Sequence, residues 1–199
     1  DGEVTALAGS MSMGANAVLG ISMGTSLAAG YCTPGGRITP WINELAFAPV
    51  DYRDNAPRDE WSGDTGCGVQ YFSQQAVARL APAAGFTFGE MPFPEQLLEV
   101  QEAMEEGHDG ARKIYQSIGI YLGYTIAHYA DFYQIENLLT LGRVTSGRGG
   151  ELILEKASEV LRDEFPHLIE QITMTTPDEQ MKRHGQAVAA ASLPACSTA

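Results

Sequence analysis

The stretch ISMGTSLAAGYCTPGG, residues 21–36, decides how the chain folds. An apolar run ends at Met23, and the next three residues, 24–26, are glycine, threonine and serine. A second run of small and apolar residues then leads to Pro-Gly-Gly at 34–36, which is a strong turn sequence. The pattern predicts an antiparallel meander of three strands joined by two tight, glycine-rich turns.

The turn at Gly24, Thr25 and Ser26 has two interpretations. Consecutive backbone N–H groups in a turn bind phosphate well, a hydroxyl group adds a hydrogen bond, and glycine allows close approach because it has no Cβ atom. A plain β-turn favours the same residue types. Taken without its context, the plain turn is the better interpretation.

Outward from this turn, the chain alternates short strands with amphipathic helices. Residues 49–68 are rich in Pro, Gly and Asp and predict a long loop inside one domain. Apolar periodicity predicts strands at residues 17–23, 27–33 and 135–142, and helices at 2–12, 69–81, a segment ending near 107, 114–129, 150–165 and 185–194. This order predicts an α/β fold with a mixed sheet packed by helices.

Composition restricts the class of protein. The 199 residues are 44% hydrophobic and 19% charged, which is typical of a globular chain that can bury a core. A formal net charge of -13 disfavours contact with nucleic acid or with anionic membranes, and no apolar run is long enough for a membrane helix. Cys32, Cys67 and Cys196 form no CxxC pair, which indicates a reduced, cytoplasmic setting.

Three further segments carry residue types that chemistry uses. Asp1 stands before a predicted helix and fits a general base or a helix cap. Glu44 lies among apolar residues, so it either binds a polar ligand or lies on the exposed side of a strand. Gly142 and Arg143 follow a predicted strand, where turns contact nucleotides in many α/β sheets and where ordinary strand-to-helix loops also occur.

These segments follow one another in a familiar order. DGEVTAL matches NDANAAAL from its aspartate onward, MGTSLAAG matches LGTGIGGG, and TLGRVTS matches VLGGGVS. On these motifs the chain resembles the C-terminal part of ROK family proteins, the group of repressors, open reading frames and sugar kinases. The resemblance runs from residue 1 to about residue 194. It implies the actin-like, ribonuclease H-like ATPase fold, with residues 1–199 as a single C-terminal lobe and the N-terminal lobe absent from this chain.

The resemblance implies a role for each candidate residue. Asp1 would be the base that activates a sugar hydroxyl. Gly24, Thr25 and Ser26 would face the phosphates of ATP, which Mg²⁺ bridges. Gly142 would lie against the adenosine. Because the chain begins at Asp1 without a methionine, we expect it to be a fragment or a processed product.

Two departures from the family pattern affect the ligands. NELAFAPV resembles GExGHMPV, so Glu44 would bind the sugar, but Phe47 replaces the histidine that contacts both sugar and zinc. Arg143 replaces a glycine of the adenosine motif, where it would narrow the adenine cleft or pair with phosphate.

The zinc motif of the family is incomplete. EWSGDTGCGV resembles CxCGxxGCxE, but Glu60 and Ser62 replace the first two cysteines, and Val69 replaces a second sugar-binding glutamate. We therefore expect no structural zinc. The loop must hold its shape through packing and hydrogen bonds, and its sugar pocket has fewer polar contacts.

The resemblance leaves two functions open: an ATP-dependent sugar kinase, and a non-catalytic, sugar-sensing regulator. A lobe retained mainly for self-association is a third. We expect a homodimer, because ROK proteins usually pair through this lobe. A stripe of small residues, Gly119, Gly123 and Ala127, fits either tight core packing or such a contact. Since phosphoryl transfer needs aligned and enclosed substrates, we expect no appreciable kinase activity from these residues alone.

Overall fold

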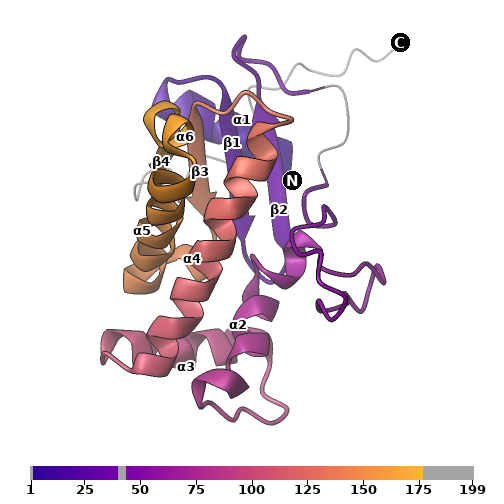
Figure 1. Ribbon diagram of the computed structural model, residues 1–199, viewed down its shortest axis with the longest axis vertical. Coiled ribbons are helices and arrows are strands. Elements are labelled where there is room, and N and C mark those ends of the chain that lie inside the picture. Colours follow the sequence, from indigo (N-terminus) through magenta and orange to yellow (C-terminus); the bar gives the residue numbers. More distant parts are fainter. Residues whose placement is uncertain (1, 40–43, 177–199) are drawn as a thin grey trace, which may run out of the picture.

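A computed structural model describes residues 2–39 and 44–176 of the chain (Figure 1). Asp1 and the helix predicted at 185–194 lie outside these described residues. The helices, 3-10 turns and strands follow in the order α1 (Gly2–Met13), β1 (Val18–Met23), β2 (Leu27–Cys32), η1 (Gly68–Gln70), α2 (Gln74–Leu80), η2 (Pro82–Ala84), α3 (Phe93–Glu105), α4 (Asp109–Ala130), β3 (Asn137–Leu141), η3 (Arg143–Thr145), α5 (Gly147–Glu164), α6 (Pro166–Gln171) and β4 (Thr173–Thr175).

The strands form one mixed sheet in the order β2-β1-β3-β4. β1 is antiparallel to β2 and parallel to β3, and β3 is parallel to β4. Of the predicted third meander strand, residues 37–39 form one isolated bridge, between Cys32 and Ile38, and residues 40–43 lie outside the described residues. The other side of β1 pairs with β3, which follows α4 and reaches the sheet by a crossover connection.

Helices cover both faces of the sheet (Figure 1). Along β1, Leu19 and Ile21 point into the main core with α4 and α5, whereas Val18 points toward α1 and packs with Ala6. A strand buried on both faces is apolar along its whole length, which explains the continuous apolar run before Met23. The predicted α/β class with a mixed, helix-packed sheet is confirmed.

The small-residue stripe of α4 packs inside the molecule. A Cβ atom on Gly119 would lie 2.6 Å from the carbonyl oxygen of Ile153, and one on Gly123 would lie 2.6 Å from Cβ of Val160. Both glycines therefore let α4 and α5 approach closely. Core packing is confirmed as the role of these two glycines, and they are not available for contact with a second copy.

Two local differences from the predicted elements have simple causes. The helix predicted at 69–81 is divided into η1 and α2, because Ser73 adopts an extended backbone and caps α2 by accepting a hydrogen bond from the N–H of Gln75. α6 and β4 were not predicted, since segments of six and three residues carry too little periodicity. No helix in residues 2–39 or 44–176 has the length and hydropathy of a membrane span.

Candidate functional site

The predicted phosphate turn and the predicted adenosine glycine lie against each other. β1 and β3 are parallel, and Ser22 pairs with Leu141, so both strands end at the same edge of the sheet. Gly142 follows with a φ of +95°, and a Cβ atom there would lie 2.3 Å from the carbonyl oxygen of Met23. Only glycine fits this contact. The end of parallel strands is also where open α/β sheets bind their ligands.

The turn between β1 and β2 leaves two backbone donors open. The N–H of Gly24 donates to the carbonyl of Ser26 at 3.0 Å, and the carbonyl of Gly24 accepts from the N–H of Gln74 at 2.9 Å. The first N–H of α2 therefore fixes the turn. Thr25 and Ser26 are exposed, and their N–H groups have no hydrogen-bond partner within the described part of the chain. The turn can offer two N–H groups and two hydroxyls to an anion.

The loop after β3 is held by α3. Gln101 Nε2 donates to the carbonyl of Arg143 at 2.8 Å, and Glu105 Oε1 accepts from the backbone N–H of Arg148 at 3.3 Å. Glu105 therefore already places a carboxylate at the N-terminal end of α5, where negative charge is stabilised. The side chain of Arg143 is exposed and forms no ion pair with residues 2–39 or 44–176. It remains a cation that a ligand can meet at this edge.

Glu44 lies in an exposed turn, not on a strand. Its carbonyl accepts from the N–H of Phe47 at 3.0 Å, and its carboxylate bonds to none of the described residues. The turn packs on η1: a Cβ on Gly68 would lie 2.5 Å from the carbonyl oxygen of Leu45 and 3.0 Å from the side chain of Leu27. Leu27 directly follows the phosphate turn, so Gly68 joins the two predicted ligand segments.

A buried carboxylate organises the loop that follows. The side chain of Asp51 is 4% exposed and accepts hydrogen bonds from Arg53 (Nη2 at 2.6 Å) and from the hydroxyls of Tyr71 and Tyr121. The Arg53 guanidinium is the main cause that holds the pKa of Asp51 well below its usual range. Burial raises the pKa of Tyr71, so this phenol stays protonated and donates.

A second buried carboxylate closes the tip of the loop. Asp59 accepts from the backbone N–H of Ser62 at 2.7 Å and from Nε2 of Gln70 at 3.1 Å. The Ser62 bond is the main cause that lowers the pKa of Asp59. Phe47 stacks on Trp61 with ring centroids 5.4 Å apart. Hydrogen bonds and packing hold this part of the loop.

The metal-ligand pattern of the loop is also incomplete in space. Glu60 is exposed, and Cys67 is buried as a free thiol whose pKa burial raises. Among the described residues, no three His, Cys, Asp or Glu side chains gather where they could hold a metal ion.

Sequence reasoning missed Asp51, Gln101 and Glu105. Asp51 and Glu105 stand among other acidic residues, and a charge in such a run usually faces solvent. The signal that could have found Asp51 is its place two residues before an arginine, Arg53, in a loop whose zinc motif is incomplete. Gln101 and Glu105 are one helical turn apart on α3, so they share a face.

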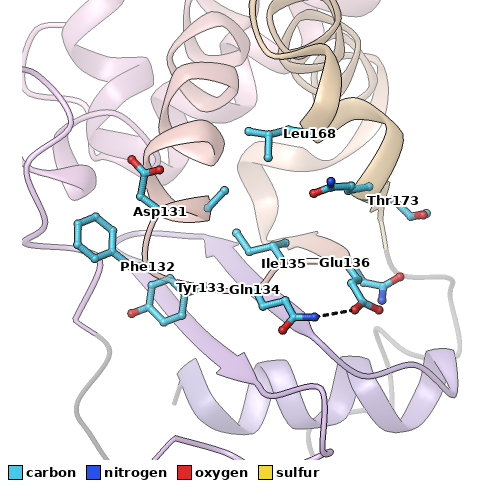
Figure 2. A pocket seen from close by; sticks show the side chains of 11 residues that line it. Asp131, Phe132, Tyr133, Gln134, Ile135, Glu136, Leu168 and Thr173 are labelled. Carbon is cyan, nitrogen blue, oxygen red and sulfur yellow. Dashed lines mark hydrogen bonds between the residues drawn. The ribbon is translucent and has the colours of Figure 1, made fainter.

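A cavity of about 870 Å³ lies at the opposite edge of the sheet and contains no candidate residue. It surrounds the start of β3, whereas Gly142 follows its end. Figure 2 shows Leu168 above Ile135 in the view, and the hydrogen bond between Gln134 and Glu136 below them; its length is 3.1 Å. The carboxylates that line this cavity, Asp131 and Glu136, are exposed, and the other lining residues give no indication of a particular ligand.

Comparison with known proteins gives results at the level of structure. No protein-family model matches the sequence, and neither does any curated protein sequence. A ROK family transcriptional regulator, described as a homologue of the E. coli Mlc protein, superposes with a TM-score of 0.74 at 21% identity, over 95% of this chain and 50% of its own. The ROK hexokinase from Thermus thermophilus gives a TM-score of 0.69 at 17% identity, over 94% and 62%.

A third solved structure is the ROK family glucokinase from Streptomyces griseus, in complex with glucose and AMPPNP. It gives a TM-score of 0.67 at 19% identity, over 96% of this chain and 66% of its own. The chain thus spans between a half and two thirds of the length of these proteins. At identities this low, the superpositions establish the fold and nothing further. The chain therefore has the fold that these ROK family structures share, the actin-like ATPase fold, over a part of its extent.

Proposed function

We propose that the chain is the C-terminal lobe of a ROK family sugar kinase, which transfers the γ-phosphoryl group of ATP to a sugar hydroxyl. One observation carries the proposal: Gly142 packs on the backbone of Met23, directly beside the open N–H groups of Thr25 and Ser26. A nucleotide across this edge would place its phosphates on the turn and its adenosine against Gly142. Solved relatives of the same fold include kinases of this class.

Each part of the site would have a distinct task in the transfer. The turn at Gly24, Thr25 and Ser26 would stabilise the charge that develops on the phosphate oxygens. Glu44 would accept hydrogen bonds from the sugar and orient it. Asp1 would take the proton of the hydroxyl whose oxygen attacks the γ-phosphorus, and ADP would leave.

Mg²⁺ would enter with ATP. This ion keeps several waters and is usually held by phosphates and only one or two protein oxygens. The hydroxyls of Thr25 and Ser26 are the side-chain oxygens that the turn itself offers. When bound, the ion would neutralise phosphate charge.

A sugar-sensing regulator without catalysis is the second candidate function. Its support is the aromatic stack of Phe47 on Trp61, where the family has a polar sugar contact, together with the exposed guanidinium of Arg143 at the adenosine side. A regulator of the same fold superposes with a TM-score of 0.74. In this function the protein would bind the sugar through Glu44 and would not bind a nucleotide.

Calorimetric titration of the intact parent protein with Mg-ATP, alone and with glucose or mannose, separates the two functions. Nucleotide and sugar binding together support the kinase, sugar binding alone supports the regulator, and the absence of both contradicts each. Ser26→Asp places a carboxylate beside the phosphates, so it should weaken Mg-ATP binding about tenfold or more because like charges repel. Thr65→Asp, on an exposed residue away from the turn, is the matched control.

A homodimer is the assembly that the resemblance implies. Light scattering on the intact protein tests it. A monomer at high concentration would contradict it and would leave the phosphate site unaffected.

A further inference from the structure

A second polar groove lies outside the candidate site, between α2 and the two loops that flank it. Its floor is the face of α2 that carries Gln75 and Arg79, and its walls are the loop segments 57–61 and 86–89. Figure 1 shows α2 and α3 together at one end of the molecule, beyond the end of the sheet. The cavity has a volume of about 730 Å³, which is the size that encloses a small organic ligand.

Aromatic rings form the apolar part of this groove. Trp61 is 83% exposed and Phe93 is 42% exposed, and both line the cavity. Phe86 and Phe88 stack on each other with centroids 5.5 Å apart. Large aromatic side chains left in water at the edge of a cavity mark an interaction site. Their flat faces suit the apolar face of a ring.

The charged side chains of the groove cancel one another. Arg58 and Arg79 supply two positive charges, and Asp59 and Glu60 supply two negative charges. The chain as a whole carries a net charge of -13, so this lining is less acidic than the chain as a whole. A lining without net charge selects neither an anion nor a cation. It suits a neutral ligand that both donates and accepts hydrogen bonds.

A chain of side-chain amides fixes the polar groups in place. Gln70 Nε2 donates to Asp59 Oδ1 at 3.1 Å and to Gln75 Oε1 at 2.7 Å, which uses both amide hydrogens. Arg79 Nη2 donates to the carbonyl of Gln70 at 2.9 Å. The Nε2 donors of Gln75 bond to none of the described residues, although its oxygen is held. Gln75 is thus a pre-oriented donor with open capacity at the groove.

We propose that this groove binds a neutral saccharide, a disaccharide by the size of the cavity. Trp61 and Phe93 would lie against its ring faces. Gln75 and Arg79 would donate to its hydroxyls, and Glu60 would accept from them. Each sugar hydroxyl both donates and accepts, and the planar amide, guanidinium and carboxylate groups offer paired partners of both kinds. The site adjoins the sugar position proposed at Glu44, because Trp61 stacks on Phe47, but its lining does not include Glu44.

Two-dimensional NMR of the ¹⁵N-labelled chain tests the proposal, with sucrose, maltose, lactose and cellobiose as probes. At least one of them should shift the indole N–H of Trp61 and the side-chain amide of Gln75 with saturation. The chain has two tryptophans, so Trp61→Ala identifies the indole signal.

Two variants should weaken the binding about tenfold each, by loss of one ring contact or of one donor. Trp61→Ala removes a side chain that is mostly in water, so the fold should persist. Gln75→Glu keeps an oxygen that accepts from Gln70, replaces the open donors by an acceptor and adds a negative charge. Phe132→Ala, at another exposed ring, and Gln171→Glu, which adds the same charge at a glutamine outside the groove, are the controls and should bind as the unaltered chain does.

The proposal is overturned if none of the four disaccharides shifts these signals, or if the affinity is unchanged in both groove variants. Glu44→Gln separates the two sugar positions. It should leave the titration of the groove unchanged, so a failure of the proposed kinase or regulator function would not affect this result.

Discussion

The candidate site around Gly142 and the loop that follows Glu44 differ in how far buried side chains hold them. At Gly142 the contact joins backbone to backbone and depends on the absence of a side chain. The loop over residues 44–70 has such contacts too, at Gly66 and Gly68, but it is held in addition by the buried carboxylates of Asp51 and Asp59. The first region should reject a Cβ atom at Gly142 yet tolerate changes to the exposed hydroxyls of Thr25 and Ser26. The second should tolerate many surface changes yet fail when one carboxylate is neutralised.

The largest effect should come from Gly142→Ala. Its Cβ atom would meet the carbonyl oxygen of Met23 at 2.3 Å, so β1 and β3 would have to separate. We expect a loss of more than about 3 kcal/mol in the free energy of unfolding. Urea denaturation followed by circular dichroism measures it.

Gly85→Ala is a control for positive φ without a contact. Gly85 has a φ of +92°, like the +95° of Gly142, but its ψ is 10° against 170°, so it lies in the left-handed helical region, and no atom lies within 4 Å of its Cβ position. Its cost should be only the backbone strain, about 1 kcal/mol. Equal losses in the two variants would mean that strain alone, and not the contact with Met23, makes glycine necessary.

The next effect should come from Asp51→Asn. The amide cannot accept from Arg53, Tyr71 and Tyr121 at once, and it leaves buried donors unpaired. We expect a loss of about 3 kcal/mol, measured by the same denaturation. Asp54→Asn, at an exposed carboxylate of the same loop, should change stability by less than about 0.5 kcal/mol. If the two variants lose equal stability, side chains do not hold the loop.

The two regions also differ in how far the sequence predicts them. The turn at residues 24–26 and the glycine at 142 could be identified because glycine and hydroxyl residues at strand ends are local signals. Their juxtaposition needs the parallel pairing of β1 with β3, and the sequence predicts both strands but not which strand each one pairs with. Asp51 escaped prediction although Arg53 lies only two residues away, because its burial depends on Tyr71 and Tyr121, which lie 20 and 70 residues further along.

Much of the helical part could be predicted because its signals are local. α4 buries Ile114, Ile118, Leu122 and Ile126 at regular helical spacing, and a pattern that repeats over so many residues is recognised directly in the sequence. The sequence does not decide whether Gly119 packs in the core or contacts a second copy, because the spacing shows that the residues on one helix face are small but not what packs against them. The contact with Ile153 on α5 decides it.

A smaller effect should appear as a pH dependence of the stability, to which the buried carboxylates of the loop contribute. The folded pKa values of Asp51 and Asp59 lie below their unfolded value, near 4, so the folded state holds these protons more weakly than the unfolded state does. Their stabilisation is complete above about pH 4 and is lost as the pH falls further. Urea midpoints between pH 7 and pH 3 should fall, and Asp51→Asn should make that fall less steep. An equal slope in the variant would contradict the assignment.

The smallest effect on stability should come from Ser26→Ala. The hydroxyl is exposed and bonds to no described residue, so the free energy of unfolding should change by less than about 0.5 kcal/mol. Ser73→Ala is the contrasting control, since the buried Oγ of Ser73 caps α2 and donates to the carbonyl of Val69, and its loss should cost about 1 kcal/mol or more. If Ser26→Ala is as costly as Ser73→Ala, the turn is built for the fold. If Ser26→Ala leaves stability unchanged but weakens Mg-ATP binding, the hydroxyl serves to bind the ligand. The exposed side chains of the turn would then contribute to binding and not to the stability of the fold.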